Sequence, residues 1–152
     1  LPGWDRAQCA AVEGVSGACL MLRRSALDAV GLLDEGFFLF GEDADLCLRL
    51  RQRQWQVHYC GEAEVVHQGG ASTGQVRRRA ALHALVSRQR FFRKHRGPAY
   101  AVAHRLANIA LALAKMLASL PAMASPAARQ TLGLQWRILR WCATGRSDHE
   151  SS

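Results

Sequence analysis

The sequence lacks the cysteine spacings that mark metal-binding or redox motifs. Its five cysteines form no CxxC pair and no pattern typical of a zinc site. Three of them lie in apolar stretches, where a free cysteine behaves as a small hydrophobic residue. We therefore expect free thiols and a reducing compartment, the cytosol.

The N-terminus lacks a leader sequence and an initiator methionine. It reads LPGWDRAQCAAVEG, without the basic n-region or the apolar h-region of a secretory signal. We expect the chain to be a piece of a longer protein.

Acidic residues are scarce, and the stretch from residue 77 to residue 96 has none. The chain holds 20 Lys and Arg against 12 Asp and Glu, which gives a formal net charge of +8. Such a block attracts the phosphates of nucleic acids, nucleotide sugars or anionic lipids, although a solvated helix face is the alternative. Its only aromatic residues are Phe91 and Phe92, too few for base stacking, so we expect no nucleic-acid partner. The block comprises Arg77, Arg78, Arg79, Arg88, Arg90, Arg93, Lys94 and Arg96.

The sequence divides into two regions of different composition. Residues 1–75 mix short apolar runs with glycines, as in an α/β domain. Residues 76–145 are rich in Ala, Leu and Arg and predict helices over 76–95, 99–120 and 127–143. Residues 146–152 are expected to be disordered. The sequence thus predicts an α/β domain followed by a helical extension.

Local signals in the first region predict alternating strands and helices. GACLMLRR (17–24) reads as a buried strand, and WQVHYC (55–60) and AEVVHQGGAS (63–72) read as two more. A helix over 25–31 would begin at Ser25 as N-cap, with Asp28 as a capping-box partner, and stop at Gly31. A turn follows at 34–36, and a second helix is expected over 42–53.

The predicted helix over 99–120 is amphipathic. Its polar residues (His104, Arg105, Asn108, Lys115 and Ser119) fall within an arc of roughly 100° at 100° per residue. Arg105 and Lys115 interrupt the apolar run, so it falls short of the ~20 apolar residues of a spanning helix. We weigh two arrangements: a membrane interface with the cationic stripe toward lipid headgroups, or packing on the first region. Trp136 and Trp141 would serve as interfacial anchors.

Three carboxylates stand together in FLFGEDADLCLRLRQRQ. Glu42 and Asp45 share one helix face, and Asp43 points about 100° away from them. One carboxylate can accept a proton from a bound hydroxyl while another hydrogen-bonds the same ligand. Read alone, the three acids are more simply explained as a helix N-terminus stabilised by negative charge.

Two further features accompany the acids. His67 ends an apolar run before a glycine turn, which leaves its imidazole accessible as a metal ligand or phosphate donor, although a structural histidine is the simpler alternative. The glycine-rich EGVSGA (13–18) leads into the first predicted strand. A metallohydrolase built on Asp43, Asp45 and His67 would need more ligands than the sequence supplies.

The order of these motifs resembles family 2 glycosyltransferases, most closely the bacterial rhamnosyltransferase-like enzymes that build polysaccharides and cell-wall linkers. SGA before RR, VGLLDEGFF, GEDADLCLRL, and VVH before GGAS carry the resemblance, over residues 12–96. It implies the C-terminal half of a GT-A (Rossmann-like) domain in an inverting hexosyltransferase. The substrates would be a nucleotide-diphosphate sugar and a glycan or lipid-linked acceptor, at the cytoplasmic side of the cell membrane.

The resemblance also assigns roles to residues. Asp43, the second acid of the ED pair, would be the general base. Glu42 and Asp45 would shape the acceptor pocket, Asp45 also orienting its helix, and Ser16, Gly17 and Ala18 would form a small-residue wall. His67 would help bind the divalent cation, Mg²⁺ or Mn²⁺, that bridges the donor diphosphate.

Some positions depart from the family pattern. Gly14 stands where an aromatic residue is common, Gln54 where a glycine often ends the helix, and Gly61 where a proline is usual. No DxD-type motif precedes residue 42, so we expect the donor-binding half to be absent and this chain alone to be inactive. The rival interpretation is a non-catalytic basic helical module that binds anionic membrane or nucleic acid.

Overall fold

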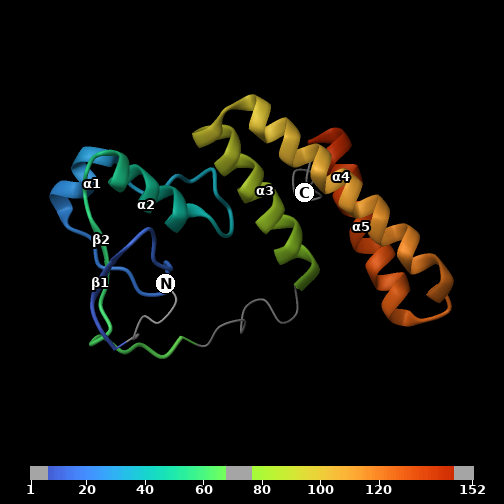
Figure 1. Cartoon of the computed structure of the whole chain (residues 1–152), viewed down its shortest axis with the longest axis horizontal. Coiled ribbons are helices and arrows are strands. Elements are labelled where there is room, and N and C mark those ends of the chain that lie inside the picture. Colours follow the sequence, from blue (N-terminus) through green and yellow to red (C-terminus); the bar gives the residue numbers. More distant parts are fainter. Residues whose placement is uncertain (1–6, 68–76, 146–152) are drawn as a thin grey trace. The chain divides into compact units, whose positions relative to one another are not determined.

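The structure is a computed structural model that describes residues 7–67 and 77–145, with the side chains of residues 77–79 excepted. The chain divides into two compact units, Leu1–Arg77 and Arg78–Ser152. Figure 1 shows their helices and strands, and each unit is considered by itself. The predicted disordered tail and the end of the predicted strand over 63–72 lie outside the described residues.

Two short antiparallel strands join the ends of the first unit. β1 (Ala10–Val12) pairs with β2 (Val57–Tyr59), with Ala10 opposite Tyr59. β2 confirms the strand predicted over 55–60, in shorter form. β1 was not predicted, because its three small apolar residues show no alternation and gain strand geometry only from a partner far along the chain.

Helix α1 (Arg24–Val30) follows the prediction at its end but not at its start. Gly31 terminates it with a φ of 81°, a left-handed value that suits glycine. The predicted N-cap is wrong: Arg23 takes that position without a side-chain hydrogen bond. Asp28 instead accepts a hydrogen bond from Arg24 Nε at 2.9 Å, because residues four apart meet on a helix surface.

The predicted strand over 17–24 is also wrong. Leu20 and Leu22 pack against the core of the first unit, whereas Met21 between them is 97% exposed. The alternation is that of a strand, but no other described strand pairs with this segment. Residues 63–67 likewise form no strand, and Val66 there is 93% exposed.

Helix α2 (Glu42–Gln52) confirms the helix predicted over 42–53. It packs on α1 through a core of Ala26, Leu46 and Leu50. Phe40 and Gly41, just before it, both have positive φ values, 70° and 91°. This left-handed turn is costly for a phenylalanine, and it sets the direction in which the helix begins.

The second unit consists of the three predicted helices, α3 (Arg77–Arg96), α4 (Pro98–Ser119) and α5 (Pro126–Thr144). A 3₁₀ turn, η1 (Leu120–Ala122), follows α4. α4 and α5 lie side by side in Figure 1 and make the most extensive helix contact. The core comprises Leu82, Leu85, Trp141 and Cys142. Trp141 is therefore buried and is not the interfacial anchor that we predicted, whereas Trp136 is 60% exposed.

The polar arc of α4 faces the other helices of its unit. His104 Nδ1 lies 2.8 Å from Gln89 Oε1 on α3, and Gln89 Nε2 donates to the Ala101 carbonyl at 2.8 Å. Arg105 stacks over the Trp141 ring at 6.0 Å and donates to its carbonyl at 3.4 Å. The predicted orientation, with the cationic stripe toward lipid headgroups, therefore does not hold for Arg105. By length and composition alone, Pro98–Ala122 could cross a membrane, contrary to our expectation of a shortfall.

The contact between α3 and α4 is expected to weaken on acidification. Burial lowers the pKa of His104 below its ordinary value of 6.5, and the Arg88 guanidinium lowers it further. Neutral His104 therefore stabilises the fold fully above about pH 6.5, and this stability is lost as pH falls through the lowered pKa. Thermal melting between about pH 7.5 and pH 5 should show a steeper loss for wild type than for His104→Gln. The exposed His58→Gln is the control, and identical slopes for wild type and His104→Gln would contradict the prediction.

Candidate functional site

One face of α2 holds the glycine-rich segment 13–18. Gly17 N–H donates to Asp43 Oδ2 at 2.9 Å, and Cys47 Sγ lies 4.0 Å from the Val15 carbonyl oxygen. One turn further, Arg51 lies 3.6 Å from the Glu13 carboxylate. Positions 43, 47 and 51 are four apart and share a helix face, so the segment runs along the helix with residue 17 at its N-terminal end.

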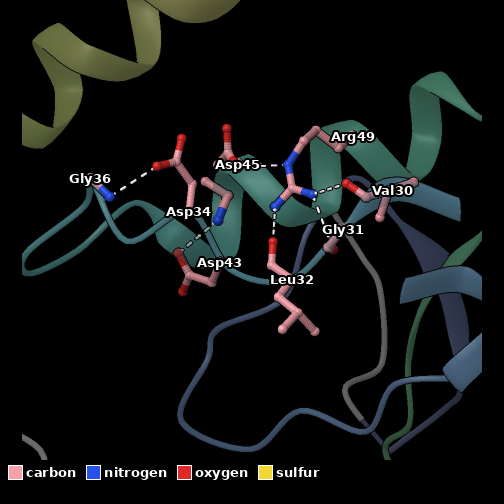
Figure 2. Close-up of polar contacts among 9 residues, drawn as sticks. Val30, Gly31, Leu32, Asp34, Gly36, Asp43, Asp45 and Arg49 are labelled. Carbon is pink, nitrogen blue, oxygen red and sulfur yellow. Dashed lines mark hydrogen bonds and ion pairs between the residues drawn. The ribbon is translucent and has the colours of Figure 1, made fainter. Parts of the chain in front are cut away.

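The Asp43 carboxylate is fixed by two backbone donors. Its Oδ2 accepts from Gly17 N–H, and its Oδ1 accepts from Ala44 N–H at 2.7 Å. Figure 2 shows the Asp43 side chain at the start of α2. Since each carboxylate oxygen has two acceptor sites, Asp43 keeps capacity for a further donor. The side chain is half-buried at the first turn of α2. Asp43 is thus an oriented acceptor that a ligand hydroxyl can reach.

Glu42 carries a buried oxygen with an unfilled hydrogen-bonding role. Its Oε2 is buried and has no hydrogen-bond partner among the described residues. A buried acceptor left unpaired costs about 1–3 kcal/mol, and native proteins seldom tolerate one without a reason. The left-handed Phe40–Gly41 turn directly before it adds backbone strain at the same place. Both features single out the start of α2 as a candidate ligand site.

Asp45 lies on a different side of α2 from Asp43 (Figure 2). It is 0% exposed and accepts from Arg49 Nε at 2.8 Å. The Arg49 guanidinium also donates to the carbonyl of Val30, the last residue of α1, and to those of Gly31 and Leu32 after it. This buried ion pair ties the end of α1 to α2. Its geometry favours the predicted orienting role of Asp45, while the predicted acceptor contact stays a prediction.

The predicted small-residue wall lies against the acid site. Ser16, Gly17 and Ala18 are all exposed, and Ser16 Oγ accepts from Ala18 N–H at 3.3 Å to close a local turn. A Cβ added at Gly17 would lie 3.5 Å from Asp43 Cβ, an ordinary contact distance. The structure therefore brings residues 16–18 and Asp43 together, although 26 positions separate Gly17 from Asp43.

His67 is exposed and stands apart from the described cluster of potential metal ligands. That cluster consists of Cys9, Cys60 and Glu62, all exposed, with ligand atoms within 4.8 Å of one another. Sequence spacing gave no sign of it, because Cys9 and Cys60 meet only through the β1–β2 pairing. The register that places Ala10 opposite Tyr59 places Cys9 opposite Cys60.

We expect this cysteine pair to form a disulfide under mild oxidation. The two Sγ atoms are 3.2 Å apart, so a closing movement of roughly 1.2 Å reaches the bond length of about 2.05 Å. With diamide as oxidant, two thiols become one disulfide and the diamide takes up both hydrogens. A hydrogen bond with Cys9 raises the pKa of the Cys60 thiol, so the reaction should accelerate at alkaline pH. Peptide mass spectrometry should find the Cys9–Cys60 link, and preferential linkage through the exposed Cys19 would contradict the β1–β2 register.

A pocket of about 600 Å³ opens at the other end of the glycine-rich segment. Arg51 is among its lining residues and lies eight positions beyond Asp43, or about 12 Å along the helix. None of the predicted site residues lines this pocket. The buried orphan oxygen of Glu42 and the oriented Asp43 therefore locate the candidate site better than the concavity does. The lining comprises Ala11, Val12, Glu13, Gly14, Arg51, Gln54, Trp55, Gln56 and Val57.

Comparison with known proteins finds a family match over the part of the chain that contains the candidate site. A family model described as glycosyltransferase like family 2 matches residues 6–90, more than half of the chain. An N-acetylglucosaminyl-diphospho-decaprenol L-rhamnosyltransferase of Mycobacterium tuberculosis is 46% identical over 64 residues, which cover 42% of this chain and 21% of that protein.

A second relative is more distant. The low-salt glycan biosynthesis hexosyltransferase Agl10 of Haloferax volcanii is 29% identical over 56 residues, which cover 37% of this chain and 18% of that protein. The chain spans about a fifth of the length of the curated relatives it matches. No solved structure matches it significantly.

Proposed function

The chain belongs to family 2 of the glycosyltransferases, and we propose that it forms the acceptor side of a site that transfers a sugar from a nucleotide-diphosphate donor. Family membership implies the GT-A fold for the matched region. The described residues contribute mostly helices to it, with the β1–β2 pair as their sheet. The acceptor would be a glycan or a lipid-linked sugar.

The observation that carries the proposal is the Asp43 carboxylate held by Gly17 N–H, together with the unpaired buried oxygen of the preceding residue, Glu42. In an inverting displacement, an acceptor hydroxyl oxygen attacks the anomeric carbon while the nucleoside diphosphate leaves from the opposite face. Asp43 takes the hydroxyl proton as the new bond forms, which is general base catalysis. The backbone donors keep the carboxylate aimed, so little reorganisation is needed at that step.

Neighbouring residues would position the acceptor. Glu42 Oε2 accepts a hydrogen bond from a second hydroxyl of the acceptor, which removes the unpaired buried oxygen. Ser16, Gly17 and Ala18 let the sugar approach the backbone closely, since none of them carries a bulky side chain. Asp45 acts at a distance, by holding α2 through Arg49.

Members of this family commonly use a divalent cation, Mg²⁺ or Mn²⁺, which would neutralise the charge of the leaving diphosphate. His67 is the residue that we expect to bind it. The described residues around His67 do not make up a complete ligand set, because the cluster of potential ligands is Cys9, Cys60 and Glu62. Hard cations such as Mg²⁺ prefer oxygen ligands over these thiols. The general-base step at Asp43 involves only the chain's own carboxylate.

We also propose an acceptor and a location, and the name of the mycobacterial relative supports the choice of acceptor. The mycobacterial relative is, by its name, a transferase that acts on a sugar linked to diphospho-decaprenol. We propose a comparable lipid-linked acceptor in bacterial polysaccharide or cell-wall synthesis, presented at the cytoplasmic face of the membrane. The donor would be a cytosolic nucleotide sugar.

The proposal is tested on the protein as its gene encodes it. Nucleotide-linked L-rhamnose and other nucleotide sugars are offered with a polyprenyl-diphosphate-linked sugar, and the released nucleoside diphosphate is measured. Acceptor-dependent release supports transfer. Vesicle or DNA binding without transfer from any donor would instead favour the non-catalytic basic module.

A further inference from the structure

The α4 helix presents its apolar side outward. Its inward side carries the polar groups that contact α3 and α5, His104 and Arg105 among them. Ile109 packs against the core, and small residues complete the inward face, where Ala101 and Ala112 are 4% and 1% exposed. This is the reverse of a helix in a water-soluble bundle, which turns its apolar stripe toward the core.

Large apolar side chains follow the outward side of α4 and continue into η1. At 100° per residue these side chains fall within an arc of roughly 60°. Only 11% of an 18-residue apolar stretch within residues 98–122 is buried. Single exposed apolar residues are common on protein surfaces, whereas a continuous exposed apolar strip of this kind marks a binding surface. We call it the outward strip; it comprises Val102 (56% exposed), Leu106 (60%), Leu113 (53%), Leu117 (69%) and Leu120 (48%).

The charge around the outward strip identifies the occupant as an anionic surface. No Asp or Glu occurs between Glu64 and Asp148, so the entire described second unit is without an acidic residue. Lys115 is exposed on α4 itself. On α5, the exposed Trp136 lies one turn from the exposed Arg140, the pairing of aromatic and cation found at membrane interfaces. DNA phosphates would pair with the cations, but the leucines of the outward strip would stay exposed to water.

The helix is better suited to lie in the interface than to cross the bilayer. Arg105 and Lys115 are ten residues apart, about 15 Å along the axis, so a spanning orientation would place both charges within the hydrocarbon. Such charges are strongly disfavoured at the helix centre. α5 packs alongside and would carry Arg129 and Arg137 in as well. In the plane of the surface, none of these cations has to enter the hydrocarbon.

We propose that the second unit binds an anionic lipid bilayer in the plane of its surface, with the outward strip of α4 among the acyl chains. The inference goes beyond sugar transfer and does not depend on it. It would tether the chain to the membrane that carries any lipid-linked acceptor.

The test is co-sedimentation of the full chain with phosphatidylglycerol–phosphatidylcholine vesicles. Leu106→Gln with Leu117→Gln changes no charge and leaves the core untouched. It is expected to weaken vesicle binding at least about tenfold, since two large exposed apolar groups lose their transfer into lipid. The matched control is Met21→Gln with Val66→Gln, which removes two even more exposed apolar side chains from the first unit and should leave binding unchanged. Vesicles of phosphatidylcholine alone should bind more weakly than anionic ones.

Three results would overturn the proposal. The first is equal vesicle binding by wild type and the double variant. The second is DNA binding without vesicle binding. The third is a change from dimer to monomer in the variant with unchanged vesicle binding, which would assign the outward strip to a second copy of the chain. Should the double variant lose helicity by circular dichroism, Leu113→Gln alone replaces it, with an expected loss of about threefold.

Discussion

Replacing Asp43 by asparagine is expected to lower the rate of sugar transfer by about a hundred- to ten-thousandfold, with donor binding changed less than about twofold. Asparagine has nearly the same shape and keeps one oxygen to accept from Gly17 N–H or Ala44 N–H. It cannot take a proton from the acceptor hydroxyl at neutral pH. The loss therefore falls on the chemical step, measured as kcat in the transfer assay, and not on the donor affinity.

Two variants sharpen this test. Asp43→Glu keeps the charge but moves the carboxylate by one methylene away from the Gly17 donor, so it should retain part of the activity. Asp28→Asn removes an exposed acid of α1, 61% exposed at the side chain, and should leave transfer unchanged. If Asp43→Asn transfers sugar within about threefold of wild type, Asp43 is not the general base.

Replacing Arg49 by methionine is expected to destabilise the first unit by about 3–5 kcal/mol, because it leaves the buried Asp45 carboxylate without its cation. Methionine preserves much of the side-chain volume, so the loss is chiefly electrostatic. It also removes the donors to the Val30, Gly31 and Leu32 carbonyls. Hydrogen exchange of peptides from α1 and α2 in the full chain measures the change in this unit alone.

The ion pair between Arg24 and Asp28 gives a matched control for Arg49→Met. It has the same i,i+4 spacing and a similar 2.9 Å contact, but its side chains are 86% and 61% exposed. Arg24→Met should therefore cost less than about 1 kcal/mol. Replacing both buried partners, as Asp45→Leu with Arg49→Met, should recover part of the stability. Equal effects of Arg49→Met and Arg24→Met would contradict the structural importance of the buried pair.

Local chemistry in the sequence was enough to locate α2 and the helices of the second unit. Acids at the start of α2 and arginines at its end match the helix dipole, and Gly31, Gly97 and Pro98 mark the ends of their helices. The motif order was enough to identify the family, which the match over residues 6–90 confirms. Strands were predicted less well, since residues 17–24 and 63–67 have strand-like composition but no described pairing partner.

The sequence by itself determined that Glu42, Asp43 and Asp45 stand together at a helix start, because neighbours along a chain cannot be separated. Only the tertiary structure decided that Asp43 meets Gly17, that Asp45 is buried with Arg49, and that Glu42 keeps an unpaired oxygen. The same holds for α4. Its amphipathic pattern is local, but the side that faces outward depends on the polar and aromatic groups of α3 and α5 that contact it. Hydrogen bonds and burial between distant segments settle such questions, and local propensity does not encode them.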